Sequence, residues 1–200
     1  MRKIILKSNF FYQALRVLLT PLFKLYYNVK IIDKEFIPKN GAFIICGNHL
    51  NVMDQFPVIA STSRTIHWLS KKEYFDGKHR WFFIITRCIS VDRGKHDGKA
   101  KSEAINYLMK NEAIGLFPEG TRNKTNKELL DFKKGAVKMA KETNSQIIPF
   151  AVNGDFKFRS KNLVVRFGKP IIVKESDDLE EANTKLRNEI LKLQRMNNNM

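Results

Sequence analysis

His49 and Asp54 stand five residues apart, directly after a short apolar run at 42–46. A carboxylate that binds an imidazole fixes its tautomer and stabilises its protonated form, which makes the histidine a general base near neutral pH. Five residues along a regular helix would turn the two side chains away from each other, so this pair requires a loop or a bent helix start. Without that contact the segment is a loop histidine followed by a helix N-cap aspartate, and the spacing alone favours this second interpretation.

A second polar group follows another apolar run, at 113–117, where Glu119, Gly120, Thr121 and Arg122 form one tight turn. A glycine lets the backbone bend close to a ligand, and a guanidinium can bind phosphate through two hydrogen bonds. The segment therefore predicts a phosphate site. If the block stood alone, the default would be a Pro-Gly turn with a surface ion pair between Glu and Arg.

Three more cations fall near the same predicted edge. Arg93 follows a short apolar run at 89–91, and Lys133 and Lys134 open a predicted helix. Cations at a helix N-terminus oppose the helix dipole unless an anion lies nearby. Their placement favours an anion site beside the tight turn.

Apolar runs alternate with segments of helical spacing along most of the chain. Strands are predicted at 42–46, 65–69, 89–91, 113–117, 147–152 and 163–167, and helices at 54–61, 81–86, 97–110, 132–142 and 177–196. This order predicts an α/β fold with a largely parallel central sheet flanked by helices. Ligands of such sheets bind at the carboxyl ends of the strands, where both polar groups lie.

The segment 10–27 is the most apolar long run in the chain, and its polar residues form one stripe on a helix. A broad, aromatic-rich apolar face beside a cationic strip is typical of an amphipathic helix that lies in a membrane interface. The alternative is a helix packed on the protein's own core, with Pro21 marking a kink or a break between two short helices. We predict that residues 1–30 form an N-terminal membrane-associating element and residues 31–200 the main domain.

The overall composition limits the classes of protein. With 43% hydrophobic residues, 10 Gly and 6 Pro, the chain is neither disordered nor collagen-like. Its formal net charge of +16 predicts an anionic partner, which could be nucleic acid, a phospholipid surface or a phosphorylated substrate. Cys46 and Cys88 are too few for a disulfide framework, which fits a reducing, intracellular compartment. No apolar run reaches the roughly 18 residues of a transmembrane helix, and no signal peptide is expected.

Four sequence blocks occur in a fixed order. They are Asn48-His49 with Asp54, Asp92-Arg93, 117–122 followed by 132–136, and 147–152. Their order and spacing resemble the four blocks of the glycerolipid acyltransferase family, and most closely those of the bacterial 1-acyl-glycerol-3-phosphate acyltransferases. The resemblance runs from about Asn40 to Pro170.

The resemblance implies a role for each block. The histidine of the first block is the family's general base, which places that role on His49, with Asp54 as its orienting partner. The other implied site residues, which bind the acceptor's phosphate and support the site, are Arg93, Glu119, Gly120, Thr121 and Arg122. Two positions depart from the family pattern and could reshape the acceptor pocket: Asn51 replaces a common Ser, and Arg87-Cys88 replaces a usual Gly.

The implied reaction is direct transfer of a fatty acyl group from acyl-CoA or acyl-carrier protein to the free hydroxyl of 1-acyl-glycerol-3-phosphate, giving phosphatidate. It needs no further cofactor and no metal. The family commonly carries an N-terminal two-helix element that enters one membrane leaflet, and the segment 10–27 looks like that element. The expected location is the cytoplasmic face of the cell membrane, with an anionic lipid surface as partner.

Two alternatives stay open. The acceptor could be glycerol 3-phosphate, another lysophospholipid or an amino-lipid, because arginine binds carboxylate as well as phosphate. A basic nucleic-acid-binding protein is the rival from another class, but no helix-turn-helix, zinc or ribonucleoprotein motif accompanies the lysines, so no nucleic-acid partner is expected. His67, His79 and His96 are predicted to be ordinary loop or surface histidines, and Cys88 a small buried core residue.

Overall fold

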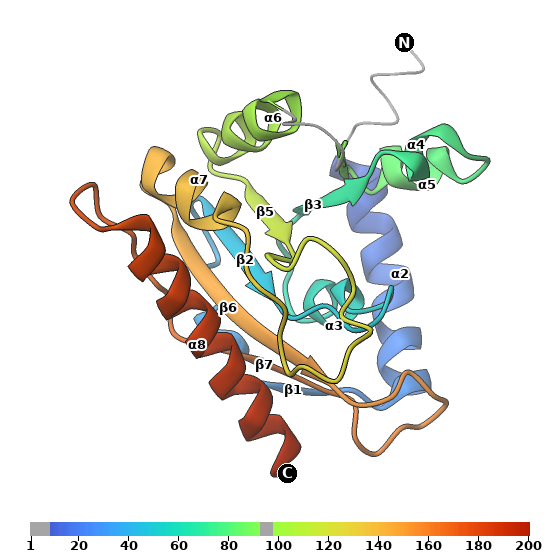
Figure 1. Cartoon of the computed structure of the whole chain (residues 1–200). Coiled ribbons are helices and arrows are strands. Elements are labelled where there is room, and N and C mark those ends of the chain that lie inside the picture. Colours follow the sequence, from blue (N-terminus) through green and yellow to red (C-terminus); the bar gives the residue numbers. More distant parts are fainter. Residues whose placement is uncertain (1–8, 93–97) are drawn as a thin grey trace.

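A computed structural model describes residues 9–92 and 98–200. Within these residues seven strands form one sheet in the order β1-β7-β6-β2-β5-β3-β4 (Figure 1). The strands are β1 (Lys30–Ile32), β2 (Phe43–Gly47), β3 (Ile66–Lys71), β4 (Ile89–Val91), β5 (Ala113–Leu116), β6 (Gln146–Asn153) and β7 (Val164–Phe167). Neighbouring strands are parallel except for β6 and β7, which are antiparallel. The predicted α/β fold with a largely parallel sheet is therefore confirmed.

Strand β2 lies between β5 and β6, and every residue of it is buried. A strand covered on both faces needs apolar side chains at successive positions, which explains the unbroken run Phe43-Ile44-Ile45-Cys46. Ile44 and Cys46 enter one half of the core, and Phe43 and Ile45 enter the other. The residues that follow β2 and β5 consequently leave the sheet at the same edge.

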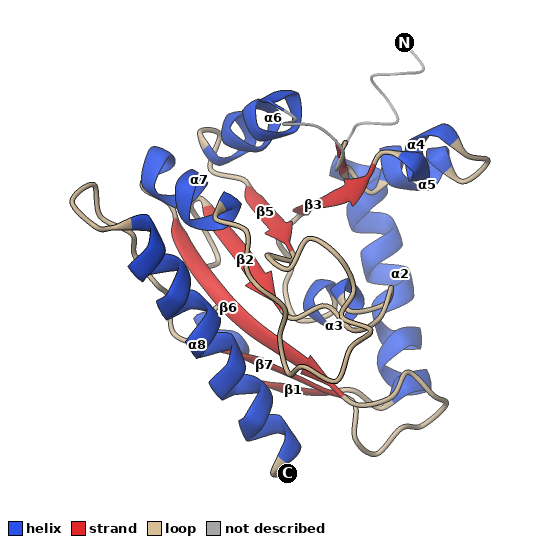
Figure 2. Cartoon of the chain, viewed as in Figure 1, coloured by secondary structure: helices blue, strands red, loops and turns tan. Residues whose placement is uncertain are grey.

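Helices cover both faces of the sheet (Figure 2). They are α2 (Asn9–Tyr27), α3 (Gln55–Ile59), α4 (Glu73–Asp76), α5 (Arg80–Ile85), α6 (Gly98–Leu108), α7 (Gly135–Thr143) and α8 (Leu179–Asn198), with a 3-10 turn at Lys34–Phe36. The apolar faces of α6, α7 and α8 pack on one side of the sheet. Residues of α3 and the end of α2 pack on the other side. The helix expected at 132–142 begins three residues later than predicted, and Lys134 is its N-cap.

The N-terminal helix differs from the prediction. Helix α2 continues through Pro21, so a break into two short helices at this residue is wrong for the described part of the element. Proline removes one backbone hydrogen bond, but side-chain contacts hold both halves of the helix. Tyr12 is buried near the N-terminal end, and Phe23 contacts Phe56 of α3 beyond the proline. Residues 1–8, which belong to the same predicted element, lie outside the described residues.

One side of α2 packs on the domain while the opposite side is exposed. Tyr12 is 3% exposed, its hydroxyl accepts a hydrogen bond from the Ile66 amide, and burial raises the pKa of Tyr12 to about 12. The exposed apolar side chains of the helix are Phe10, Val17, Leu18, Leu19, Leu22, Leu25 and Tyr26. One face of this helix therefore meets the core, the other is an exposed apolar surface, and the membrane association of the helix stays a prediction.

His67 is not a loop or surface histidine, because it is fully buried in β3. Its Nε2 lies 2.6 Å from Glu112 Oε2, its Nδ1 lies 3.0 Å from the Arg87 carbonyl oxygen, and its ring stacks on Tyr107. The prediction failed because β3 is covered on both faces, and a histidine can occupy such a strand when both ring nitrogens find partners. Arg87, at a positive φ of 58°, also bonds Glu112.

Replacing His67 by alanine should therefore destabilise the fold. The substitution removes a stacked ring and both hydrogen bonds, and we expect the free energy of unfolding to fall by about 2–4 kcal/mol. Urea denaturation followed by circular dichroism measures this change. The exposed His79 is the matched control, and His79→Ala should change stability by less than about 0.5 kcal/mol. Equal stability of both variants would contradict the assigned contacts.

Candidate active site

The loop after β2 brings His49 and Asp54 together. The Nδ1 of His49 lies 3.1 Å from Asp54 Oδ2, and the same oxygen accepts hydrogen bonds from the amides of Leu50 and Asn51, both at 2.7 Å. Asp54 is 1% exposed. Since an ionised carboxylate only accepts, the imidazole donates from Nδ1 and keeps its Nε2 for a substrate. The alternative in which the two residues do not meet is excluded by this contact.

The turn geometry explains why a five-residue spacing works. Asp54 directly precedes helix α3, and its carboxylate points back toward the loop. There it accepts hydrogen bonds from two loop amides and from the imidazole. The Asn51 side chain adds a further local bond to the Met53 amide. The loop is therefore an ordered turn ahead of a short helix.

The backbone of His49 is held by a second loop, which follows β5. Its amide donates to Glu119 Oε1 at 2.8 Å, and its carbonyl accepts from the Asn123 amide at 2.7 Å. The imidazole itself stacks on Phe117, with ring centroids 3.9 Å apart and planes inclined by 7°. Both the main chain and the ring of His49 are thus fixed by the block 117–123.

Glu119 contacts backbone rather than open space. Its second oxygen, Oε2, accepts from the Leu130 amide at 2.9 Å, so the carboxylate joins the loop after β2 to the far end of its own loop. The residue is 4% exposed, and burial raises the pKa of its carboxyl while the two amide donors work in the opposite direction. The geometry gives Glu119 the means to position His49.

Next to His49 lies a cavity of about 790 Å³. Its polar lining includes Ser70, Lys71, Thr121 and Arg122, whereas most of the remaining wall is apolar. The main apolar side chains are Tyr12, Val52, Met53, Phe56, Ile59, Trp68, Leu69, Trp81, Phe82, Phe83 and Phe117. The site therefore combines His49, the cations Lys71 and Arg122 and a large apolar wall.

A second groove, of about 600 Å³, adjoins this cavity. The two share side chains of α2, α3 and α5 and of the residues next to them, namely Tyr12 of α2, Phe56 and Ile59 of α3, Phe82 of α5, Met53 before α3 and Thr86 after α5. Its other lining residues are mostly apolar residues of α2, together with Arg16, Thr20, Ala60 and Phe158. Apolar lining thus extends from the cavity beside His49 to the exposed side of α2.

The predicted phosphate residues separate into two groups. Thr121 and Arg122 line the cavity, whereas Glu119 and Gly120 do not line it. Gly120 has a φ of 71°, which lies in the left-handed region that favours glycine. Arg93 lies outside the described residues.

Lys71 is a site residue that the sequence analysis missed. It ends β3 and lines the cavity beside His49 and Arg122, and its ammonium lies 2.6 Å from a carboxylate oxygen of Glu73. The signal that could have found it is its position at the carboxyl end of a buried parallel strand. Without the strand order, the adjacent Lys72 could not be distinguished from it.

Cys88 packs against the core and also lines the cavity. Burial raises the pKa of its thiol, and the same is true of Cys46. We expect a disulfide reagent to react with the native protein at pH 8 at least about tenfold more slowly than with the urea-unfolded chain, because little thiolate forms. Absorbance of the released thiolate measures both rates. Equally fast reaction in the two states would show that the thiols are not protected.

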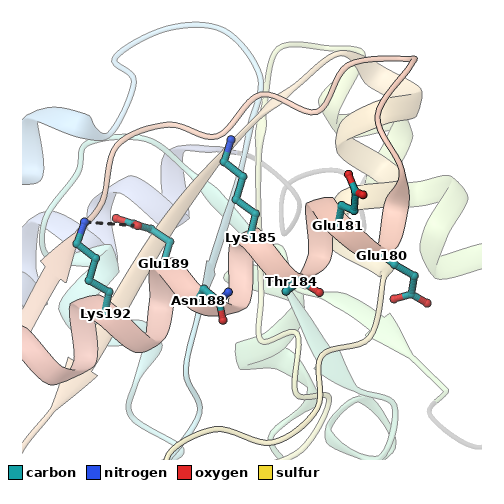
Figure 3. A pocket seen from close by; sticks show the side chains of 7 residues that line it. All are labelled: Glu180, Glu181, Thr184, Lys185, Asn188, Glu189 and Lys192. Carbon is teal, nitrogen blue, oxygen red and sulfur yellow. Dashed lines mark ion pairs between the residues drawn. The ribbon is translucent and has the colours of Figure 1, made fainter.

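A further pocket, on α8, has no histidine and no apolar side chain in its lining. Figure 3 shows the charged and polar side chains that line this open pocket along α8, where Lys192 pairs with Glu189 at 3.7 Å. Helix α8 packs on the face of the sheet opposite to α3. Across residues 9–92 and 98–200, no three His, Cys, Asp or Glu side chains are grouped so that they could hold a metal ion. Of the helices that the structure describes, none has both the length and the apolar character to cross a membrane.

A histidine–carboxylate pair beside a largely apolar cavity defines the class of site, and the family follows from comparison. Residues 28–153 match the model of the acyltransferase family. The chain belongs to this family.

Individual relatives agree with the family match. The chain is 32% identical over 150 residues to a 1-acyl-sn-glycerol-3-phosphate acyltransferase of Borreliella burgdorferi, covering 72% of this chain and 60% of the relative. It is 28% identical to the enzyme of the same name from Bacillus subtilis, covering 79% of each. The crystal structure of the 1-acyl-sn-glycerophosphate acyltransferase PlsC from Thermotoga maritima has the same fold, with a TM-score of 0.71 at 23% identity, over 90% of this chain and 76% of that one.

Proposed function

We propose that this protein is a 1-acyl-sn-glycerol-3-phosphate acyltransferase. It transfers a fatty acyl group from an acyl thioester to the free hydroxyl of lysophosphatidate and forms phosphatidate. The observation that carries the proposal is the His49–Asp54 pair at the polar end of an apolar cavity. The names of the relatives from Borreliella and Bacillus support the choice of acceptor.

In the proposed mechanism His49 is the general base. Its Nε2 takes the proton of the acceptor hydroxyl while the hydroxyl oxygen attacks the thioester carbonyl, which forms the new C–O bond and a tetrahedral intermediate. Collapse of the intermediate breaks the C–S bond, and the imidazolium returns its proton to the leaving thiolate. Asp54 stabilises the imidazolium between these two steps.

Cations at the cavity would bind the acceptor's phosphate. Arg122 can donate two parallel hydrogen bonds to phosphate oxygens, Thr121 can donate one, and Lys71 adds a point charge. Arg93 is proposed as a further ligand from the sequence resemblance. The apolar wall beside them suits the acyl chains of both substrates, whether the donor is acyl-CoA or an acyl-carrier protein.

Glu119 has a different proposed role from the neighbouring residues of its block. Its two carboxylate oxygens already accept hydrogen bonds from the amides of His49 and Leu130. We therefore propose that Glu119 positions His49 and does not bind phosphate. Gly120 acts through its backbone conformation in the same turn.

The proposed location is the cytoplasmic face of the cell membrane, without a span. The apolar side of α2 is exposed and its groove adjoins the catalytic cavity, so a lipid acceptor could reach His49 from a bilayer. The net charge of +16 would hold the protein against anionic lipid.

The deciding experiment is an acyl transfer assay. Purified protein in anionic vesicles is given a long-chain acyl-CoA, or an acyl-carrier protein in a parallel series, with lysophosphatidate, glycerol 3-phosphate and other lysophospholipids as acceptors. Mass spectrometry identifies the products. We expect phosphatidate from lysophosphatidate; a product from another acceptor alone would replace the proposed substrate, and no product with either donor would reject the proposal.

Replacing Arg122 by alanine should weaken use of phosphorylated acceptors. Loss of a charge-assisted phosphate contact predicts a rise in KM for lysophosphatidate of roughly 10- to 100-fold. Turnover of a monoacylglycerol, which lacks the phosphate, should change much less. The exposed Lys124, two residues along the same loop, is the matched control. An equal loss on both acceptors would show that Arg122 does not bind phosphate.

A further inference from the structure

The connection from β6 to β7 presents an exposed aromatic ring on an ordered loop. Phe158 is 65% exposed at the tip of residues 154–162. The loop is closed by local bonds: Gly154 has a φ of 96° and packs against the Asn162 backbone, and the Ser160 hydroxyl donates to Asn162 Oδ1 at 2.6 Å. The Arg159 amide donates to the Tyr26 carbonyl at 2.6 Å. The fold therefore holds this ring outward rather than letting it collapse onto the core.

The exposed ring continues the apolar surface of α2. Phe158 contacts Tyr26 edge to face, with ring centroids 5.1 Å apart. The groove that adjoins the catalytic cavity is lined by Phe158 together with Leu22 and Leu25 of α2. Those two leucines are 58% and 78% exposed. Leu22, Leu25 and Phe158 thus form an exposed apolar patch along the groove.

Cations surround this aromatic tip. The side chains of Lys157, Arg159 and Lys161 are exposed on the loop, and Lys24 and Lys30 are exposed on the adjoining end of α2 and on β1. Asp155 offsets part of this charge through its ion pair with Lys157 at 3.3 Å. An aromatic ring among exposed cations matches the boundary between acyl chains and anionic headgroups, because the ring enters the apolar layer and the cations meet phosphate.

A similar cluster lies at the other end of α2. Trp81 on α5 is 54% exposed, and its neighbours Lys78 and Arg80 are exposed cations. Figure 1 shows α5 beside one end of α2 and the orange loop of residues 154–162 beside the other. The groove therefore opens between two aromatic clusters that both carry positive charge.

We propose that the loop 154–162 is a second membrane-docking element, which binds an anionic phospholipid bilayer together with α2. Phe158 enters the acyl boundary, while Lys157, Arg159 and Lys161 contact lipid phosphates. With Trp81 at the opposite end, the loop fixes the tilt of the domain so that the groove opens onto the leaflet. The inference rests on the proposed function for its purpose, a lipid acceptor, but the docking itself requires no turnover.

Charge decides between a bilayer and a protein partner. A hydrophobic interface between proteins disfavours exposed lysines around its centre, whereas a bilayer with anionic lipid gains about 1 kcal/mol from each cation near its surface. The loop carries three such cations around one phenyl ring. A soluble acidic carrier protein is the competing partner, and the experiment below separates the two.

Insertion can be measured with a tryptophan reporter. In a Trp81→Phe background, Phe158→Trp adds one exposed indole to the buried Trp68. Vesicles of phosphatidylglycerol and phosphatidylcholine, with bromine on the acyl chains, should quench the new fluorophore strongly. The Trp81→Phe protein without the reporter supplies the background quenching of Trp68. Equal quenching of the two proteins would overturn the proposal.

Binding affinity tests the cations. We expect Phe158→Ser combined with Lys157→Glu and Lys161→Glu to lower the vesicle partition coefficient about tenfold or more, because each lost cation is worth roughly fivefold. The matched control carries Lys138→Glu and Lys185→Glu, two exposed lysines on α7 and α8, and makes the same charge change. Cosedimentation without any substrate gives both coefficients. Equal weakening in the two proteins would reduce the effect to net charge and overturn the proposal.

Two further readouts separate this inference from the proposed reaction. Acyl transfer to detergent-dispersed lysophosphatidate should be unchanged in a variant that carries only Lys157→Glu and Lys161→Glu, since neither lysine lines the cavity or the groove. If the wild-type protein had no transferase activity but the loop variant still lost vesicle binding, the docking element would stand without the proposed function. Unchanged vesicle binding with a lower affinity for acyl-carrier protein would assign the loop to a protein partner and overturn the lipid proposal.

Discussion

Replacing His49 by alanine should lower kcat for acyl transfer by about 10²- to 10⁴-fold, the range of a lost general base. The loss should leave the fold intact, because Asp54 keeps its hydrogen bonds to the amides of Leu50 and Asn51 when the imidazole is removed. The stacking on Phe117 and the bond from His49 Nδ1 to Asp54 are lost, which together cost roughly 2–3 kcal/mol. Mass-spectrometric product formation measures kcat, and thermal unfolding checks stability.

Asp54→Asn is the companion variant. Asparagine preserves the shape of the side chain and can still accept from a loop amide, but it no longer stabilises an imidazolium on His49. We expect kcat to fall as well, while KM for lysophosphatidate stays near the wild-type value because Asp54 does not line the cavity.

A folded His49→Ala protein with wild-type turnover would contradict the mechanism proposed here.

Glu119→Gln should produce the second large effect, through position rather than through contact with substrate. An amide has one accepting oxygen, so either the His49 or the Leu130 amide would lose its partner inside the protein. An unpaired buried amide costs about 1–3 kcal/mol, and a misplaced base can cost roughly 10- to 100-fold in rate. We expect a lower melting temperature together with a lower kcat.

The kinetic split distinguishes Glu119 from the phosphate residues. Glu119→Gln should lower kcat with little change in KM for lysophosphatidate, whereas Arg122→Ala should raise KM. Glu128, an exposed carboxylate on the same loop that pairs with Arg195, is the matched control, and Glu128→Gln should alter neither constant. A selective rise in KM for Glu119→Gln would return Glu119 to the phosphate site that the sequence resemblance implies.

The sequence predicted the buried strands well because a strand covered on both faces needs consecutive apolar residues. It missed β1, whose three residues are only partly covered at the sheet edge. It offered a kink or a break at Pro21, and the break is wrong because a local rule does not include the contacts on either side of the proline. The burial of His67 was missed for a related reason, since its hydrogen-bond partners Glu112 and Arg87 are distant in the chain.

The candidate site shows the same division. Block order and residue type located His49, Thr121 and Arg122 at one edge of the sheet. The contact of His49 with Asp54 depends on a turn whose shape spacing does not specify. The hydrogen bond from the His49 amide to Glu119 joins residues 70 positions apart. The sequence therefore could not show whether the Glu119 carboxylate binds backbone amides or lies at the phosphate site.

The proposed catalytic pair and the cations follow the central strands, whereas the apolar wall of the cavity comes largely from α2, α3 and α5. Substitutions in these peripheral helices can lengthen, shorten or bend the space for an acyl chain while the reacting groups keep their anchorage. Under the proposed function, the preferred length of the acyl chain can therefore change between related proteins while His49 and Asp54 keep their contacts. The same separation makes Phe56 and Ile59 the first positions to substitute in order to change that preference.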